Sequence, residues 1–191
     1  MKFEDAYNKL IKYEGGYVND PDDKGGETYK GIARNFHSNW EGWQVIDKLK
    51  TNPDYKKILN SPNFNLLDNA TKKFYKEKFW DIFESDELPY EIAEEIFEIA
   101  VNTGIARATI IIQTTCNLLN RNQKLYSNIS VDGKFGNITK YILNQCIDKN
   151  GTKLVFNVIN ILQGCFYIEL MLKDEVKEKY IGWFNRIEIK R

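Results

Sequence analysis

The segment Tyr13–Ala33, YEGGYVNDPDDKGGETYKGIA, carries the residues that decide how the rest of the chain is interpreted. It follows a predicted helix, and glycine pairs stand directly after Glu14 and directly before Glu27. Its acidic residues are Glu14, Asp20, Asp22, Asp23 and Glu27. Such a segment can be a solvated acidic loop, a metal-binding loop or an active site, and each alternative requires a different spacing.

A calcium loop of the EF-hand type fits this segment poorly. Counting from Asp20, the ligand positions 1 and 3 are acidic and Gly25 stands at position 6. Position 5 is Lys24 and position 12 is Gly31, where a ligand and a bidentate glutamate are required. A phosphate loop is disfavoured as well, because GGETYKG lacks the G-K-[ST] order and five carboxylates would repel the phosphate.

Acid–base chemistry fits the segment better, with Glu14 as the proton donor. Glu14 stands where the first predicted helix ends, and the negative end of the helix dipole disfavours a second negative charge there. An apolar wall beside it would raise its pKa further, as a glycosidase acid requires. The second carboxylate would come from Asp20, Asp22, Asp23 or Glu27. On chemistry alone, a solvated acidic turn remains the commoner alternative.

The composition of the chain limits the classes of function. The 191 residues are 42% hydrophobic and 14% aromatic, which is typical of a globular protein. The formal net charge is zero, whereas nucleic-acid-binding domains are usually basic. A regulatory helix-turn-helix protein, with helices within residues 92–120, is therefore a weak alternative, and we expect no nucleic-acid partner.

The few cysteines and the single histidine exclude several kinds of site. Cys116, Cys146 and Cys165 form no C-x-x-C pair, and we expect all three to be buried free thiols inside helices. His37 is the only histidine, so zinc sites with two histidines are excluded. No G-x-S-x-G motif accompanies it that would favour a Ser-His-Asp triad.

Hydrophobic periodicity predicts a mainly helical chain. In the first predicted helix, Phe3, Tyr7 and Leu10 lie on one face, and Gly15-Gly16 ends it. Within the opening segment, only TYKGIA has strand character, and we expect it to form half of a small hairpin. Further helices are predicted within residues 39–50, 69–83, 88–104, 105–120, 136–146 and 154–172.

The location of the protein is predicted from its apolar segments. The N-terminus has no continuous apolar core and is not a signal peptide. Leu154–Leu172 is apolar, but Asn157, Asn160, Gln163 and Glu169 would be costly in lipid, so we expect a core helix and no membrane insertion. We expect synthesis in the cytoplasm, so that action outside the cell would require a separate route of release.

Several motifs, in order along nearly the whole chain, resemble those of the glycoside hydrolase family 108 lysozymes. EGGYVNDPDDKGGETYKGIA resembles the family's signature, and FYKEKFWDIFESDELPYEIAEEIFEIAVNTG its following segment. VDGKFGNITKYIL is similar to the D-G-x-x-G-x-x-T part of a predicted peptidoglycan-binding module, and GWFNRI to a closing G-W-x-x-R. Glu98 is a departure, since aspartate is as common there.

The resemblance implies a lysozyme-like helical fold and an N-acetylmuramidase, as in phage endolysins and secretion activator proteins. Its substrate would be the glycan strands of peptidoglycan, cut at the β-1,4 bond between N-acetylmuramic acid and N-acetylglucosamine. It implies a catalytic region over residues 1–85 and a peptidoglycan-binding region over residues 86–191, packed into one globule. It implies no metal and no organic cofactor, and we expect a monomer. The alternative is a non-catalytic peptidoglycan-binding or secretion-assisting protein that keeps the fold.

The resemblance carries one role over to a residue of this chain, that of the catalytic acid, and side-chain chemistry gives the expected roles of the others. Glu14 is the family's catalytic acid, and Thr28 with Asp22 or Asp23 is expected to position a water or to stabilise the charged transition state. The expected substrate-binding residues are Tyr17, Asp20, Tyr29, Asn102 and Thr103. For the two tyrosines the alternative is a half-buried loop anchor, and for Asn102 it is a helix C-cap.

Overall fold

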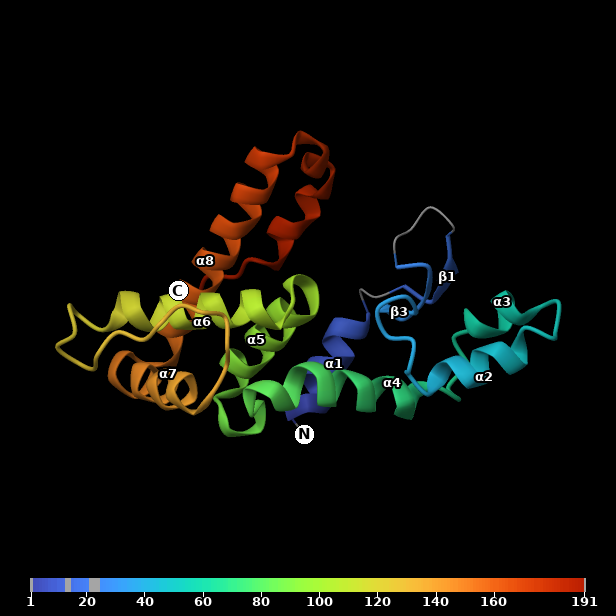
Figure 1. The fold of residues 1–191 in the computed structure, drawn as a ribbon, viewed down its shortest axis with the longest axis horizontal. Helices are drawn as coiled ribbons and strands as arrows, with labels where there is room; N and C mark the ends of the chain where they lie inside the picture. The colour runs from blue at the N-terminus through green and yellow to red at the C-terminus, as the bar shows by residue number, and fades with distance from the viewer. Residues whose placement is uncertain (1, 13–14, 21–24, 191) are drawn as a thin grey trace. The chain divides into compact units, whose positions relative to one another are not determined.

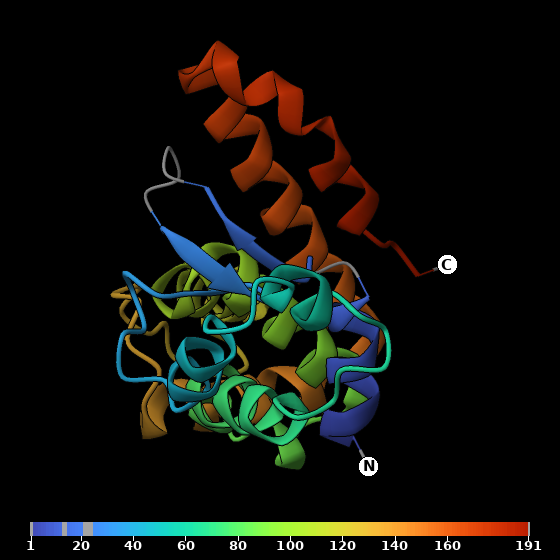
Figure 2. The same cartoon turned by 90° about the vertical axis from the view of Figure 1, so that its right-hand side faces the viewer.

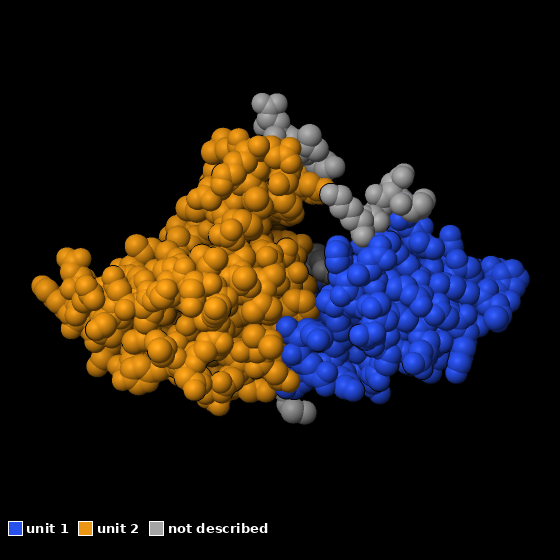
Figure 3. All heavy atoms as spheres, in the orientation of Figure 1, with its two compact units in different colours: residues 1–78 blue, residues 79–191 orange. Residues whose placement is uncertain are grey.

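Three short strands and a series of helices make up the protein, which is described by a computed structural model over residues 2–12, 15–20 and 25–190. The strands form one antiparallel sheet in the order β1-β2-β3, and helices account for most of the remaining structure (Figure 1). The predicted mainly α fold with a small hairpin is confirmed. The chain divides into unit 1, Met1–Lys78, and unit 2, Phe79–Arg191 (Figure 3). The predicted boundary after residue 85 stays a prediction.

Unit 1 holds the sheet and the helices that surround it. Its helices are α1 (Lys2–Ile11), α2 (Gly42–Leu49), α3 (Tyr55–Leu59) and α4 (Asp68–Tyr75), and its strands are β1 (Tyr17–Asn19), β2 (Glu27–Tyr29) and β3 (Ile32–Ala33). The segment TYKGIA, predicted as half of a hairpin, contains most of β2 and all of β3, and β1 was not predicted.

Aromatic side chains form much of the core of unit 1. The Tyr29 ring stacks on Trp40 with centroids 6.0 Å apart, and Trp40 meets Trp43 edge to face at 5.1 Å. Tyr7 of α1 meets Tyr75 of α4 edge to face at 5.8 Å. These contacts bury Tyr75 of α4 against α1 and Tyr29 of β2 against Trp40.

The predicted helix over residues 69–83 is not a single α-helix. After α4 the chain continues as the π-helix η1 (Lys76–Trp80) and the 3-10 helix η2 (Asp81–Phe83), followed by the 3-10 helix η3 (Ser85–Glu87). Glu84, between η2 and η3, adopts a left-handed conformation with φ 48°. The hydrophobic spacing predicted a helical segment, but it does not distinguish an α-helix from short π-helical and 3-10 turns.

Unit 2 is built from four α-helices in two pairs. They are α5 (Tyr90–Thr103), α6 (Ile105–Leu119), α7 (Asn137–Asn150) and α8 (Thr152–Lys173), and the 3-10 segment η4 (Glu175–Arg186) follows. A single glycine joins each pair: Gly104 between α5 and α6 (φ 89°, ψ 155°), and Gly151 between α7 and α8 (φ 81°, ψ 148°). Only glycine adopts this conformation readily.

Helix α8 packs on one side only. Its buried residues are Val155, Phe156, Ile159, Asn160, Gln163 and Tyr167, whereas Leu154, Ile161, Ile168 and Leu172 are exposed. Figure 2 shows η4 running back alongside α8. By length and composition α8 could cross a membrane, a test that core helices of soluble proteins also pass. The predicted core helix is therefore only half buried.

The thiol prediction was correct for two cysteines and wrong for the third. Cys116 and Cys146 are buried free thiols, whereas Cys165 is exposed. Cys165 lies on the side of α8 that carries the exposed apolar residues, which explains its accessibility.

Candidate functional site

The sheet of unit 1 separates one buried face from one open face. Thr28 pairs with Val18 on β1 and with Ala33 on β3, so these three residues share a face. Val18 is exposed, and Thr28 and Ala33 are partly exposed. The neighbours of Thr28 on β2, Glu27 and Tyr29, point to the opposite face and are buried. Thr28 is therefore the member of β2 that lies on the open face, and its hydroxyl donates to the carbonyl of Gly26 at 3.2 Å.

The turn between β2 and β3 is tied to α4. Lys30 and Gly31 both have positive φ, 44° and 78°, as in the two-residue turns of tight hairpins. The hydroxyl of Tyr75 donates to the carbonyl oxygen of Lys30 at 2.8 Å, and the Lys30 Nζ lies 2.9 Å from an Asp68 carboxylate oxygen. The hairpin is therefore held in place at its tip by a helix of the same unit.

The outer edge of β1 is completed by a side chain instead of a fourth strand. The Asn60 amide accepts from the Tyr17 backbone N–H at 2.7 Å and donates to the Tyr17 carbonyl at 3.1 Å. A Cβ on Gly16 would come within 2.0 Å of the Asn60 oxygen, so this close approach requires glycine. A Cβ on Gly15 would meet nothing within 4 Å. The second glycine of the E-G-G motif thus serves the strand edge, and only the first borders open space.

A buried ionic cluster lies under the sheet. Glu27, 8% exposed, accepts hydrogen bonds from the Tyr17 hydroxyl at 2.7 Å, the Arg34 guanidinium at 2.7 Å and the Lys50 ammonium at 2.9 Å. Arg34 also forms a two-pronged contact with Asp47, at 2.7 and 2.5 Å, and Lys50 reaches Asp47 at 3.1 Å. Two carboxylates thus face two cations, and the cluster of four charges is neutral.

This cluster keeps Glu27 ionised and withdraws it from catalysis. Burial acts to raise the pKa of Glu27, but hydrogen bonds from Lys50, Tyr17 and Arg34 outweigh it and the pKa is lowered. The second carboxylate of a glycosidase must reach the sugar or a water, whereas Glu27 is buried on the face opposite Thr28 and its oxygens already accept from three donors. Glu27 is therefore a structural anchor, which removes it from the candidates for the second carboxylate.

The two tyrosines expected to line the cleft lie in the core instead. Tyr17 is 4% exposed, and burial followed by its hydrogen bond to Glu27 raises its pKa. Tyr29 is fully buried, and burial followed by the charge of Asp68 raises its pKa to about 12. Both residues alternate with Val18 and Thr28 along their strands, and this alternation turns their rings inward. Their expected role in binding the substrate is therefore corrected to one in the core.

The predicted acids of the site differ in what the structure says of them. Glu14, Asp22 and Asp23 lie outside the described residues. Asp20 is described, follows β1 directly and is exposed. The sheet thus brings Thr28 onto the open face, while the roles of the acids stay predictions.

Asn102 and Thr103 lie in unit 2 at the end of α5. The Asn102 amide donates to the Glu98 carbonyl, and the Thr103 hydroxyl donates to the Ile99 carbonyl, both at 2.8 Å. Both side chains thus bond back to carbonyls four residues earlier in their own helix, in the last turns before Gly104 ends it. This favours the helix-end role over a substrate contact.

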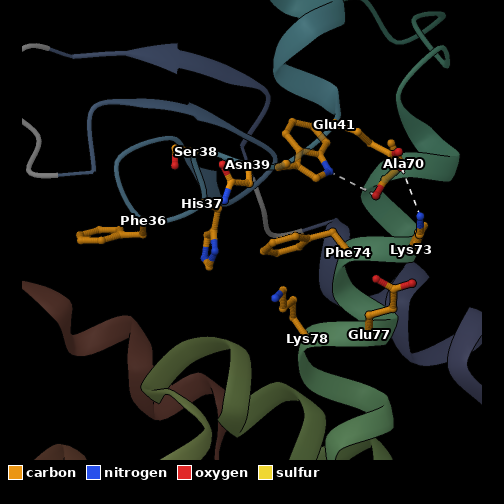
Figure 4. Close-up of a pocket in the computed structure, with 11 residues that line it drawn as sticks. Phe36, His37, Ser38, Asn39, Glu41, Ala70, Lys73, Phe74, Glu77 and Lys78 are labelled. Carbon is orange, nitrogen blue, oxygen red and sulfur yellow. Dashed lines mark hydrogen bonds and ion pairs between the residues drawn. The ribbon is translucent and has the colours of Figure 1, made fainter.

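A cavity of about 340 Å³ in unit 1 was not predicted from the sequence. It lies between the loop after β3 and helix α4, and His37 points into it beside Phe74 (Figure 4). The two rings meet edge to face with centroids 4.8 Å apart. Burial, followed by the charge of Lys78, lowers the pKa of His37, so the imidazole is neutral at pH 7. The sequence contained one sign of this cavity, an aromatic residue, Phe36, next to the only histidine. The hydrophobic pattern did not indicate that Phe36 is exposed, which the structure shows at 69%.

The motifs of unit 2 are held in place by the hydrogen bonds of Gln113 and by an ion pair of Arg186. Gln113, which is buried, donates to Asp132 at 2.9 Å and to Thr139 at 3.2 Å, and accepts from the Gly133 N–H at 3.0 Å. Asp132 and Thr139 are the first and last residues of the D-G-x-x-G-x-x-T motif, and Gly133 is its second residue. In the G-W-x-x-R motif, Arg186 lies 3.6 Å from Glu98. Glu98 thus fulfils an ionic role in spite of departing from the family pattern.

Within residues 2–12, 15–20 and 25–190, no group of three or more histidine, cysteine, aspartate or glutamate side chains could hold a metal ion.

Comparisons with known proteins identify both parts of the chain. Residues 7–104 match the family described as Glycosyl hydrolase 108, and residues 107–188 match the one described as Predicted Peptidoglycan domain. The solved structure of SagA from Brucella abortus has a TM-score of 0.56 and 21% sequence identity over 95% of each chain, a likeness that concerns the fold alone. No curated protein matches the chain. The first match covers half of the chain and includes the whole sheet, so the protein belongs to the glycosyl hydrolase 108 family.

Proposed function

We propose that the protein is a lysozyme that cleaves the β-1,4 bond between N-acetylmuramic acid and N-acetylglucosamine in peptidoglycan. The observation that carries this proposal is the joint presence of a glycosyl hydrolase 108 region and a predicted peptidoglycan domain in one chain. The first supplies the hydrolytic chemistry and the second supplies the polymer on which it acts.

Glu14 is the proposed general acid. It protonates the glycosidic oxygen while positive charge develops on the sugar ring. Gly15, beside it in the chain, borders open space where a sugar ring can approach. The open face of the sheet presents Thr28 in the same segment of chain.

The second catalytic group is proposed among Asp20, Asp22 and Asp23. The ionic cluster leaves Glu27 no free role, which narrows the choice from four acids to three. Thr28 is the proposed partner that orients a water or steadies the charged sugar. All of these residues follow Glu14 within one segment, Tyr13–Ala33.

The proposed place of action is the cell wall, reached after synthesis in the cytoplasm by a holin-dependent or dedicated route. Unit 2 is proposed to keep the enzyme on its polymeric substrate, because it contains the predicted peptidoglycan domain. We propose that the enzyme acts as a monomer.

The decisive experiment replaces Glu14 by glutamine and follows the clearing of a peptidoglycan suspension. Glutamine has the same shape but cannot donate a carboxylic-acid proton, so we expect a loss of at least about a hundredfold, the usual worth of general acid catalysis. Glu4→Gln on α1 is the matched control, since Glu4 forms only a partly exposed ion pair with Lys72, and its rate should equal that of the wild type. Clearing by Glu14→Gln at the wild-type rate would refute the assignment.

The products define the bond that is cut and the stereochemistry. Mass spectrometry of digested peptidoglycan should show N-acetylmuramic acid at the reducing ends, and N-acetylglucosamine there would refute a muramidase. Replacing Asp20, Asp22 and Asp23 one at a time by asparagine should reveal one position whose loss approaches that of Glu14→Gln. The anomer released first, read by NMR, then shows whether that group acts as nucleophile or as base.

The alternative is a non-catalytic peptidoglycan-binding protein, which the predicted peptidoglycan domain favours. It predicts that the wild-type protein sediments with purified peptidoglycan and releases no reducing ends. The lysozyme proposal predicts sedimentation together with release.

A further inference from the structure

The cavity between the loop after β3 and helix α4 has the size of a small-ligand site. Its volume of about 340 Å³ lies at the lower end of the range for such sites, roughly 300–1,000 Å³. All of its lining residues belong to unit 1. They come from Phe36–Glu41 and from helical residues 70–78, so two separate segments form the walls (Figure 4).

The walls combine aromatic faces with small polar groups. Phe36 lies at one side of the cavity and is 69% exposed, so its aromatic ring is accessible to a ligand. His37 and Phe74 present their edge-to-face pair at the centre. Ser38 and Asn39 add a hydroxyl and an amide, both of which donate and accept hydrogen bonds. Such walls suit a ring with one apolar face and a rim of hydroxyl and amide groups.

The charges around the cavity cancel. Glu41 and Glu77 are matched by Lys73 and Lys78, with Glu41 and Lys73 at 3.9 Å from each other. His37 adds no charge at pH 7, because its pKa is lowered by burial and by Lys78. A lining with no net charge offers no electrostatic gain to an anionic ligand and favours a neutral one.

The cavity lies close in the chain to the open face of the sheet. The His37 backbone N–H donates to the carbonyl of Ala33 at 2.9 Å, and Ala33 is the register partner of Thr28. The Trp40 indole N–H donates to the Ala70 carbonyl at 3.3 Å, which joins the loop to α4. The wall of the cavity is thus directly continuous with the strand beside Thr28.

We propose that this cavity is a subsite for a neutral N-acetylhexosamine ring, the N-acetylglucosamine unit of a glycan strand, packed against Phe36 and His37. The inference rests on the proposed function, because it takes peptidoglycan glycan as the substrate. It assigns the carboxylate-bearing parts of peptidoglycan, the lactyl group of muramic acid and the stem peptide, to positions outside the cavity.

The single histidine makes the test direct, since one imidazole resonance reports on the cavity. The Glu14→Gln protein is titrated with chitotriose, a neutral oligomer of N-acetylglucosamine, while the His37 Cε1–H signal is followed by NMR. We expect a saturable shift that a synthetic stem tetrapeptide at the same concentrations does not produce. Phe36→Ala should weaken chitotriose binding at least tenfold. Leu66→Ala is the matched control, as Leu66 is similarly exposed in unit 1 but does not line the cavity, and it should leave the affinity within twofold.

Three outcomes would overturn the inference: no shift with chitotriose, an equal shift with the tetrapeptide, or a chitotriose affinity that Phe36→Ala leaves unchanged. The first two use a chain with an intact cavity and so do not depend on the stability of the Phe36 variant. The proposed function is tested separately by the clearing assay. A loss of clearing in Glu14→Gln with no chitotriose shift leaves the lysozyme proposal standing and refutes the subsite.

Discussion

Replacing Glu27 by glutamine tests the ionic cluster that supports the sheet. The substitution keeps the shape of the side chain and removes the negative charge that faces Arg34 and Lys50. Hydrogen bonds to charged groups contribute about 1.5–3 kcal/mol and neutral ones about 1, so weakening two of them costs about 1–4 kcal/mol. Breaking a fully buried pair costs about 3–5 kcal/mol, which is an upper bound here because the Arg34 and Lys50 side chains are 31% and 32% exposed and Asp47 stays to balance one cation. We therefore expect a loss of about 2–4 kcal/mol in the free energy of unfolding of unit 1.

The loss should be visible in thermal unfolding. For a unit of this size, 1 kcal/mol corresponds to a Tm change of about 4–8 °C, so the Tm of unit 1 should fall by at least about 8 °C. The His37 resonance reports on unit 1 alone, because this residue is the only histidine. The matched control is Glu41→Gln, which removes an exposed ion pair, 3.9 Å long, and should cost less than about 1 kcal/mol.

The pH dependence gives the sign of the effect. The folded-state pKa of Glu27 is below its ordinary value of 4.5, so its contribution is complete above that value and is lost as the pH falls through the folded pKa. The Tm gap between wild type and Glu27→Gln should therefore be largest at pH 6–7 and should narrow as the pH falls below about 4.5. A gap smaller than that of the control at pH 7, or one that stays constant with pH, would refute the reasoning.

Three further predictions follow from single residues. Gly16→Ala should lower the free energy of unfolding of unit 1 by about 2–4 kcal/mol, because a Cβ would displace Asn60 and break its two hydrogen bonds to β1. The control, Gly15→Ala, should lower it by less than about 1 kcal/mol. Equal effects of the two substitutions would contradict the role of Gly16 at the strand edge. A thiol reagent should label one cysteine quickly in the native protein, and Cys165→Ser should abolish the fast phase; a fast phase that persists would show another thiol to be accessible. The His37 imidazole should titrate with a pKa below 6.5 in an NMR pH series, and a value above it would contradict the burial of the ring.

The longer helices could be predicted from the sequence because their buried apolar residues recur with helical spacing. The first helix was predicted over the right face, and Phe3, Ala6, Tyr7 and Leu10 are buried there. The strands were harder, since β1 has three residues and β3 has two, too short for an alternating pattern to appear. Asn60, which completes the edge of β1, is 43 residues from its partner and carries no local signal.

The location of the candidate site stays a prediction, and the orientation of its described residues could not be predicted from the sequence. The alternation along β2 follows from the pairing register, which places Thr28 outward and Tyr29 inward, and no motif carries that register. The structural role of Glu27 could not be predicted, because its partners, Arg34 and Lys50, carry no sequence signal that pairs them with it. Both are residue types that are common on protein surfaces. The cavity at His37 depends on two segments that approach only in the folded chain.

The single glycines that join the helices of unit 2 also determine where its sequence can change in length. Each pair of helices is connected by one residue, Gly104 or Gly151, which cannot absorb a change in length. An inserted or deleted residue would therefore rotate and shift one helix of the pair against its partner. The chain between α6 and α7, residues 120–136, contains no helix or strand, so a change of length there need not turn one helix against the other. Related chains that differ in length within unit 2 should therefore carry their extra residues in that loop and keep both glycine corners intact.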